Sequence, residues 1–476
     1  MKQRLLPDTD EPLSNGAVLP GPRGIRLLWT MGRLITDSLD PLDRLAETAR
    51  TYGDLIRFGL GSQELILLNH PDYLRHVLVT HQDKYARTEV LHALHPLLGD
   101  GLFTSDPETW KAQRRLLQPA FHPRHLDPTV SVVHEEVRAL LARWEVLAEA
   151  ATTVDIEFEM RALALNILTR TLFASEVTLD GPRVMEALDT VLAYASIKRH
   201  ALRVAWWTIP KPLRPPTPGR RPMEQALRVL DEIVADVIAR CRADRDAASA
   251  FMNLLLDAQD AGDIPARQVR DEMMTLLLAG FDTVAQTLAW TWYLLALHPN
   301  QERRFHAELD ALVDEEPLPL EALDQLPYGR MVLLETMRLY PPAWAIFRVS
   351  TAPDVIGGYP IPAQSYIMIS PYLMHRHPDF WEHEHTFIPE RFDRDDVSDA
   401  RTFHYLPFGH GPHTCVGKRM ALVESQTILA LIARSFRLKR TTTEPVNVVP
   451  GIIIRAKETI WMTPERRRIP VVFSSE

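Results

Sequence analysis

The sequence predicts a mainly α-helical protein with a small β-rich lobe. Helical periodicity predicts the longest elements of the chain, with helices expected at 41–52, 71–79, 108–117, 128–175 (broken near 151–154), 181–207, 223–245, 265–297 and 327–340. Strand-like segments lie near the two ends, at 54–58, 64–68, 446–455 and 459–463. We expect residues 1–476 to form a single domain, in which 1–70 and 350–375 contribute the β-rich lobe and 1–20 is a flexible lead-in.

The composition is that of an ordinary globular protein, with 46% hydrophobic and 24% charged residues. A net charge of −9 without a basic block argues against nucleic-acid binding. The two cysteines, Cys241 and Cys415, cannot form a disulfide framework and fit a reducing compartment. Because the N-terminal residues contain no apolar stretch of signal or anchor length, we expect a cytoplasmic protein without a transmembrane anchor.

The apolar stretch 273–297 carries a single charge, Asp282, and is either a membrane span or a wholly buried helix. Gly280 inside this helix costs about 1 kcal/mol relative to Ala. The Asp282–Thr283 pair adds a desolvation cost. Such departures from helix rules often mark function, although a Thr that hydrogen-bonds to its own helix is the plain alternative.

Cys415 ends a loop rich in turn formers, 408–417, and a helical pattern follows at once. A thiol near a helix N-terminus is expected to have a lowered pKa and can bind a metal as thiolate. The alternative is a buried structural cysteine, since free cysteine is among the most buried residue types.

Several motifs resemble those of the cytochrome P450 family, and the resemblance covers nearly the whole chain. Phe408, Gly409, Gly411, Cys415 and Gly417 match the haem-binding loop, and Ala279-Gly280-Phe281-Asp282-Thr283 looks like the oxygen-activation helix. Trp110-x-x-x-Arg114, Glu335-x-x-Arg338 and Pro389-Glu390-Arg391-Phe392 are similar to three further motifs, in the family's order. The resemblance implies the cytochrome P450 fold, with haem between the long central helix and the Cys415 loop.

The resemblance also implies residue roles. Cys415 would be the proximal iron ligand, Gly280 beside Ala279 would open a groove for O₂, and Asp282 and Thr283 would deliver protons. Haem contacts are expected from Trp110, Arg114, Arg348, Phe408, Gly409, His413 and Gly417. A buried network is expected from Glu335, Arg338 and Arg391. The substrate pocket is expected to include Leu91, Leu94, Leu98, Leu276, Thr287, Ala345, Ile346, Phe347, Thr459 and Ile460.

The implied function is a haem-thiolate monooxygenase that uses haem b and O₂ to hydroxylate or epoxidise an apolar small molecule. Fatty acids, terpenoids, steroids and macrolides all fit. Electrons would come from NAD(P)H through a ferredoxin or flavodoxin and its reductase, which would dock near Lys418 and Arg419, and the protein would be a monomer. A peroxide-driven peroxygenase and a haem-binding sensor are the alternatives.

Two clusters have competing readings. Trp206 and Trp207, before the proline-rich segment 210–219, could touch a membrane or pack in a lid over the substrate entrance. The histidines at 375, 377, 383 and 385 could bind zinc, but they resemble structural positions of the family's connector into Pro389.

Overall fold

The computed structural model describes residues 18–23, 41–60, 63–87, 94–122, 126–173, 179–195, 219–312, 319–393 and 402–467. Leu91, Trp206, Trp207 and most of the proline-rich segment lie outside the described residues.

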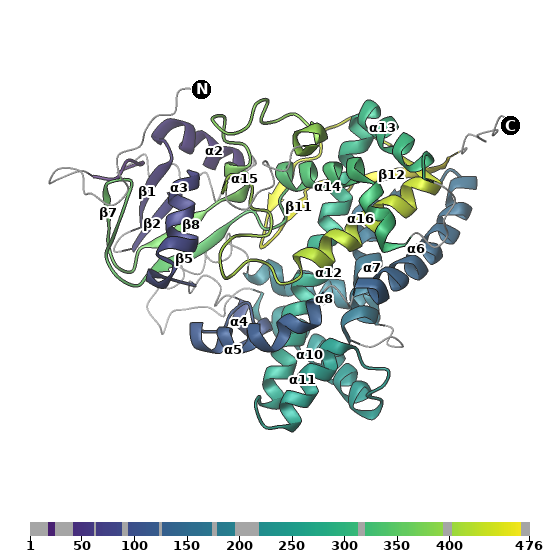
Figure 1. The fold of residues 1–476 in the computed structure, drawn as a ribbon, viewed down its shortest axis with the longest axis horizontal. Helices are drawn as coiled ribbons and strands as arrows, with labels where there is room; N and C mark the ends of the chain where they lie inside the picture. Colours follow the sequence, from purple (N-terminus) through teal and green to yellow (C-terminus); the bar gives the residue numbers. More distant parts are fainter. Residues whose placement is uncertain are drawn as a thin grey trace.

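Helices dominate the described chain and confirm the mainly α prediction (Figure 1). The α-helices are α2 (Pro41–Tyr52), α3 (Pro71–Arg75), α4 (His95–Leu98), α5 (Pro107–Leu117), α6 (Leu126–Glu149), α7 (Ile156–Leu168), α8 (Gly181–Ala195), α10 (Arg220–Ala243), α11 (Ala250–Asp260), α12 (Ala266–Leu297), α13 (Pro299–Asp310), α14 (Pro327–Leu339), α15 (Pro371–Met374) and α16 (Lys418–Ser435). Short π or 3₁₀ segments include His76–Thr80, Gln82–Lys84, Gln118–Phe121, Thr169–Phe173, Leu320–Gln325 and Pro389–Asp393.

The β-rich lobe is a five-stranded sheet in the order β1-β2-β8-β5-β3, at the left of Figure 1. Its strands are β1 (Leu55–Leu60), β2 (Gln63–Leu68), β3 (Tyr85–Ala86), β5 (Ile346–Ser350) and β8 (Tyr366–Ile369). The β2–β8 pairing is parallel and the others are antiparallel. The lobe has its own apolar core, which includes Leu55, Ile66, Ile367 and Ile369.

Three small sheets complete the β structure. β6 (Asp354–Ile356) pairs with β7 (Tyr359–Ile361), and β10 (Val448–Pro450) pairs with β11 (Ile454–Ala456). β12 (Trp461–Arg466) lies between β4 (Val154–Asp155) and β9 (Phe436–Arg440). The sequence therefore placed strands correctly near the C-terminal end but merged β10, a turn and β11 into one segment.

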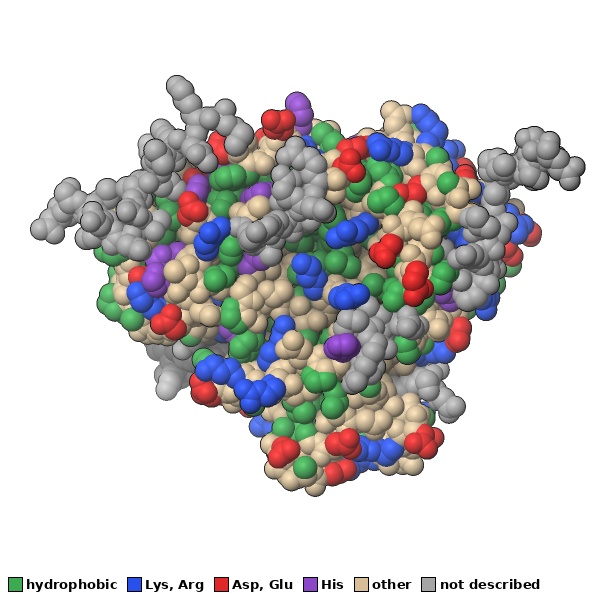
Figure 2. Space-filling model, viewed as in Figure 1, with side chains coloured by type: hydrophobic (Ala, Val, Ile, Leu, Met, Phe, Trp, Pro, Cys, Tyr) green, Lys and Arg blue, Asp and Glu red, His purple; other side chains and the backbone are tan. Residues whose placement is uncertain are grey.

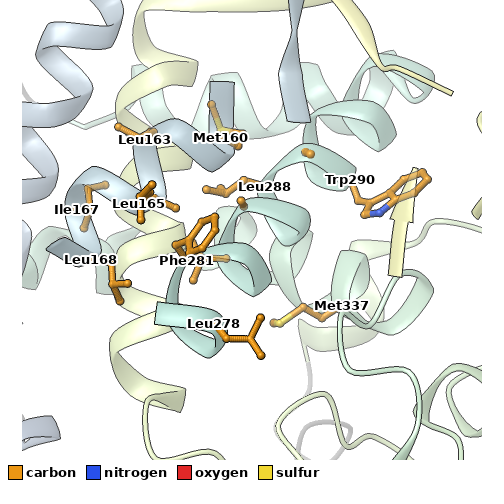
Figure 3. Close-up of a cluster of buried hydrophobic side chains, with 14 of the residues drawn as sticks. Met160, Leu163, Leu165, Ile167, Leu168, Leu278, Phe281, Leu288, Trp290 and Met337 are labelled. Atoms are coloured by element: carbon orange, nitrogen blue, oxygen red, sulfur yellow. The ribbon is translucent and has the colours of Figure 1, made fainter. Parts of the chain in front are cut away.

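Helix α12 is the centre of the helical region and packs most extensively against α7. Figure 3 shows side chains of both helices meeting around Phe281, which is fully buried. Gly280 allows this close approach, because a Cβ there would lie 2.3 Å from Leu168 Cδ1. In the described part of the chain, neither α12 nor any other helix is long and apolar enough to cross a membrane.

Candidate active site

A cavity of about 390 Å³ lies between α12 and the loop that precedes α16. This size is within the range of small-molecule and cofactor sites. Further wall residues come from several elements, including α5, α8, the segment 342–348 and the turn between β10 and β11. Segments that are far apart in sequence thus converge on one space.

The Cys415 sulfur faces this cavity, so the residue is solvent-accessible from inside although it lies deep in the protein. Its N–H donates to the Phe408 carbonyl at 3.0 Å, which closes the loop before α16. Burial raises the pKa of the Cys415 thiol, and the Gly417 N–H and the Arg114 charge only partly offset this. The lowering of the Cys415 pKa that was expected from the helix N-terminus is therefore wrong, because burial outweighs it.

Gly411 fixes the path of the Cys415 loop. Its φ of 74° lies in the left-handed region. A Cβ at Gly411 would stand 2.1 Å from the Leu78 carbonyl oxygen. Both the conformation and the close approach to the β-rich lobe therefore require glycine.

Three arginines gather at one edge of the cavity around His413. Arg87 donates to His413 Nδ1 at 2.8 Å, and Arg114 donates to the Thr414 carbonyl at 2.9 Å. Arg348 donates to the Phe347 carbonyl at 2.8 Å and is 8% exposed. Burial and the neighbouring arginines lower the pKa of His413 to about 3, so the imidazole is neutral and accepts from Arg87.

The positive charges of these three guanidinium groups are not neutralised by carboxylates of the described residues. Burial lowers the pKa of Arg348 to about 10 and, with the charges of Arg348 and Arg114, that of Arg87 to about 9. Within the described ranges, no Asp or Glu side chain forms an ion pair with Arg87, Arg114 or Arg348. Arg348 is buried and Arg87 and Arg114 are half-buried, and cations removed from water in this way are stabilised by an anionic partner. The two propionates of a haem would supply it, and the planar guanidinium suits carboxylates, so the residues fit the cofactor.

Sequence analysis did not identify Arg87. Its partner His413 follows 326 residues later, and no local motif marks the position. Trp110, which the sequence did single out, packs on the His413 ring with centroids 4.0 Å apart. Phe408, Gly409 and Gly417 also line the cavity, as expected for haem contacts.

Helix α12 supplies the opposite wall through Ala279, Gly280, Thr283 and Thr287. The Thr283 hydroxyl donates to the Ala279 carbonyl at 2.8 Å, which leaves its oxygen able to accept a further hydrogen bond. The two readings of this threonine are thus compatible: it bonds to its own helix and it lies at the cavity.

Asp282 faces away from this wall. It is not among the residues that line the cavity, and its side chain is 2% exposed. Arg161 Nε lies 3.2 Å from Asp282 Oδ1, and Arg455 donates to Asp282 Oδ2. Asp189 joins both arginines, at 2.8 Å and 2.7 Å. The carboxylate is therefore held in a charged network behind α12.

The loop between α4 and α5 is fixed to α12 by two buried carboxylates. Asp271 accepts from the Asp100 N–H at 3.0 Å, and Glu272 accepts from the Leu102 N–H at 3.0 Å. Burial raises the pKa of Glu272 to about 7. These contacts hold Leu98 and Leu102 against the cavity.

The structure brings Glu335, Arg338 and Arg391 together behind the Cys415 loop. Glu335 and Arg338 are fully buried and share two hydrogen bonds of 2.7 and 2.8 Å. Arg391 Nε lies 3.4 Å from Glu335 Oε1, and the Ile388 N–H donates to the same oxygen at 2.9 Å. Arg338 also donates to the carbonyls of His375, Glu384 and Thr386.

The histidines of the connector make separate contacts. The buried His375 accepts from the Leu406 N–H at 2.9 Å, just before the Cys415 loop. His377 Nε2 lies 3.0 Å from Asp54 Oδ1 in the β-rich lobe. Among described residues, no group of histidines, cysteines and carboxylates has a geometry that could hold a metal ion.

The expected substrate residues divide into two groups. Leu98, Leu276, Thr287, Ala345, Ile346 and Phe347 line the cavity. Leu94 is instead buried in the core. Thr459 is exposed, and Ile460 is buried beside β4, where its carbonyl accepts from the Ile156 N–H. The structure therefore corrects the expectation that these two residues form the tip of a hairpin over the cavity.

The turn that does reach the cavity carries Ile452 and Ile453. The Pro450-Gly451 dipeptide before it is a turn signal that could have located this hairpin from the sequence. Other apolar wall residues include Leu172, Leu192 and Val284, which the sequence did not indicate.

Comparisons with known proteins agree with this geometry. Residues 19–462 match the family Cytochrome P450. The chain is 34% identical to cyclooctat-9-en-7-ol 5-monooxygenase of Streptomyces melanosporofaciens, over 84% of this chain and 85% of that protein. It is 31% identical to pentalenene oxygenase of Streptomyces avermitilis (83% and 85%) and 28% identical to the chloroplastic protein LUTEIN DEFICIENT 5 of Arabidopsis thaliana (90% and 74%).

Proposed function

Since this chain belongs to the cytochrome P450 family and is a monooxygenase of that family, we propose that it hydroxylates or epoxidises a terpenoid in the cavity beside Cys415. The observation that carries the proposal is the combination, in one cavity, of Cys415, apolar walls and three arginines that form no ion pair with a described carboxylate. Arg348 is buried, and Arg87 and Arg114 are half-buried. Haem, when bound, supplies the activation of O₂ and the insertion of one oxygen atom into a C–H or C=C bond.

The protein's own residues prepare this chemistry. The Cys415 sulfur would bind the iron as thiolate, and Arg87, Arg114 and Arg348 would hold the propionates. The apolar side chains of α8, α12 and the β10–β11 turn exclude water and leave shape as the means of orienting the substrate. We propose that the Thr283 hydroxyl accepts a hydrogen bond from water in the cavity. Asp282 would contribute protons only after one of its arginine partners releases it.

The apolar walls favour a substrate without charge. Around Leu98, Leu276 and Ile453 the cavity offers few partners for a polar group, and burying an unpaired polar group is costly. The names of two relatives give cyclooctat-9-en-7-ol and pentalenene as the molecules they act on. Terpenoids of this kind fit better than fatty acids, whose carboxylate would need a cation.

Electrons would come from NAD(P)H through a ferredoxin or flavodoxin and its reductase. Figure 2 shows Lys and Arg side chains across the middle of the face on which α16 lies in Figure 1. Lys418 and Arg419, at the start of α16, are exposed and close in sequence to Cys415. A basic surface near the sulfur would attract an acidic electron carrier.

The test is an optical titration of the haem-loaded protein with cyclic terpenoids, fatty acids, steroids and macrolides. We expect a low-spin to high-spin shift with terpenoids, and ¹⁸O from ¹⁸O₂ in the product when a surrogate redox system supplies electrons. A shift only with another class would refute the substrate assignment. Product formation with peroxide alone, and none with O₂ and electrons, would refute the monooxygenase assignment in favour of a peroxygenase.

A further inference from the structure

The side of the cavity formed by α7, its continuation and α12 has a single kind of polar side chain. Among the described residues on this side, the polar ones are the threonines Thr171, Thr275, Thr283 and Thr287. Each hydroxyl donates to the carbonyl four residues earlier in its own helical segment, at 2.7–2.9 Å. A hydroxyl has one proton but two acceptor lone pairs. This side of the cavity can therefore accept hydrogen bonds from a ligand, while its own protons are already in use.

Three of these threonines leave little room for a substrate group. Thr275 is 3% exposed, and its hydroxyl lies against the Gly101 backbone, since a Cβ on Gly101 would stand 2.1 Å from the Thr275 oxygen. Thr287 is 5% exposed. Thr283 is half-buried, but it lies on the wall opposite Cys415, where its free lone pair is assigned to water. The fourth threonine is thus the one whose hydroxyl is open to a substrate group.

Thr171 lies in the cavity wall toward the N-terminal end of α12. It belongs to the short segment that continues α7. Helix α7 runs along α12 in the opposite direction, because Glu157 at its start accepts from Gln286 at 2.8 Å and Leu168 at its end lies against Gly280. Thr171 follows Leu168 by three residues, lines the same cavity and is half-buried. Its hydroxyl is therefore on the N-terminal side of Gly280.

The surroundings of Thr171 select the kind of polar group that can lie beside it. The wall on this side is otherwise apolar, with Leu168 and Leu172 on the same segment and Leu276 on α12. A polar substrate group that found no partner here would lose free energy. A substrate hydroxyl avoids this loss, because it can donate to Thr171. A ketone or ether oxygen can only accept, and the Thr171 proton is already donated to the Ile167 carbonyl at 2.7 Å.

We propose that the substrate is a terpenoid alcohol whose hydroxyl donates a hydrogen bond to Thr171 Oγ1. The inference rests on the proposed oxygenation of terpenoids and names the substrate more closely. Shape orients the hydrocarbon part of the molecule, and the one hydrogen bond fixes which end lies toward the start of α12. Because this anchor is on the N-terminal side of Gly280, oxygen is inserted into a carbon remote from the existing hydroxyl. A reaction that places a hydroxyl on the terpenoid skeleton, by hydration or by oxygenation, must then come first.

The test measures how Thr171→Val changes the binding of an alcohol, a ketone and a hydrocarbon of one skeleton. Two sets serve as probes: menthol, menthone and p-menthane, and cyclooctat-9-en-7-ol with its ketone and its parent hydrocarbon. Binding to the haem-loaded protein is followed by the spin-state shift and by calorimetry. Valine keeps the shape of threonine without its hydroxyl. We expect the variant to bind the alcohol about three- to tenfold more weakly, the effect of one net hydrogen bond, and to bind the hydrocarbon as wild type does.

The matched control is Thr169→Val in the same segment. The Thr169 hydroxyl also donates to a carbonyl of its own helix, that of Leu165, at 2.7 Å, but it is 2% exposed and does not line the cavity. This control should bind every probe as wild type does. In turnover of the alcohol, wild type and the control should give one main product, and Thr171→Val should give a mixture of positional isomers.

The outcomes separate this inference from the proposed function. Unchanged alcohol binding in Thr171→Val would overturn the inference, and so would an equal loss for alcohol, ketone and hydrocarbon, which would show a structural role. In both cases terpenoid binding, and with it the proposed function, would stand. If no terpenoid of either set shifted the spin state or released heat, the terpenoid assignment would fail and the inference with it.

Discussion

Replacing Glu335 with Gln should destabilise the protein and its haem loop together. Glu335 neutralises Arg338, and both side chains have no exposed surface. Breaking a buried pair by removing one charge costs about 3–5 kcal/mol, because the other charge stays buried without compensation. For a protein of this size the entropy of unfolding is on the order of 1 kcal/mol per kelvin, so the melting temperature should fall by about 3–5 °C.

The assay is thermal unfolding together with the haem-to-protein absorbance ratio of the purified variant. A matched control is Glu145→Gln, which removes the partner of Arg466 from a pair whose side chains are 50% and 70% exposed. That change should cost no more than about 1 kcal/mol. If Glu335→Gln had the same melting temperature and haem content as Glu145→Gln, the buried network would not stabilise the protein or its haem loop.

Two further predictions concern the β-rich lobe and its contact with the Cys415 loop. Gly411→Ala should lower the free energy of unfolding by at least about 2 kcal/mol and lower haem content, because backbone strain and the Leu78 carbonyl both oppose a Cβ. The control is Gly53→Ala, at a position with positive φ but open space, which should show only the smaller cost of strain in the same denaturant titration. Asp354→Asn should lower the free energy of unfolding by about 2–3 kcal/mol at pH 7. Burial would raise the Asp354 pKa, but hydrogen bonds from His76, Lys84 and Tyr85 hold it well below 3.8. Because the folded-state pKa is depressed, this stability is present above pH 3.8 and shrinks below it, so a wild-type-to-variant difference that stays constant on acidification would contradict the assignment.

Much of the fold was predictable from local patterns. Helix α2 has the bounds expected from periodicity, and α12 begins one residue after the expected Pro265. The helices α11 and α13 were not expected. Helix α13 follows α12 after a single residue, His298, so its start was hidden behind the stop signal His298-Pro299. Helix α11 has a sequence signal at Ser249, whose side chain caps it by accepting from the Met252 N–H.

The site was predictable where a motif is local and not where it depends on packing. Successive helix residues are about 100° apart, so Thr283 and Asp282 could not both face the cavity, and helix geometry alone could have shown this. Arg87 meets His413 only through the tertiary fold. The pKa of the Cys415 thiol is raised instead of lowered, because the effect of burial is larger than that of the helix N-terminus. The spacing of residues in a motif does not show how deeply a side chain is buried.

The most direct test of the account is the absorption spectrum of the reduced, CO-bound protein for wild type, Cys415→Ser and Cys241→Ala. The chain has two cysteines, and the sulfur of Cys241 is buried and donates to the Phe173 carbonyl away from the cavity. We predict the red-shifted band of a thiolate-bound haem in wild type and Cys241→Ala, and its loss in Cys415→Ser. A thiolate band that survives in Cys415→Ser, or its absence from the haem-loaded wild type, would contradict the haem-thiolate site.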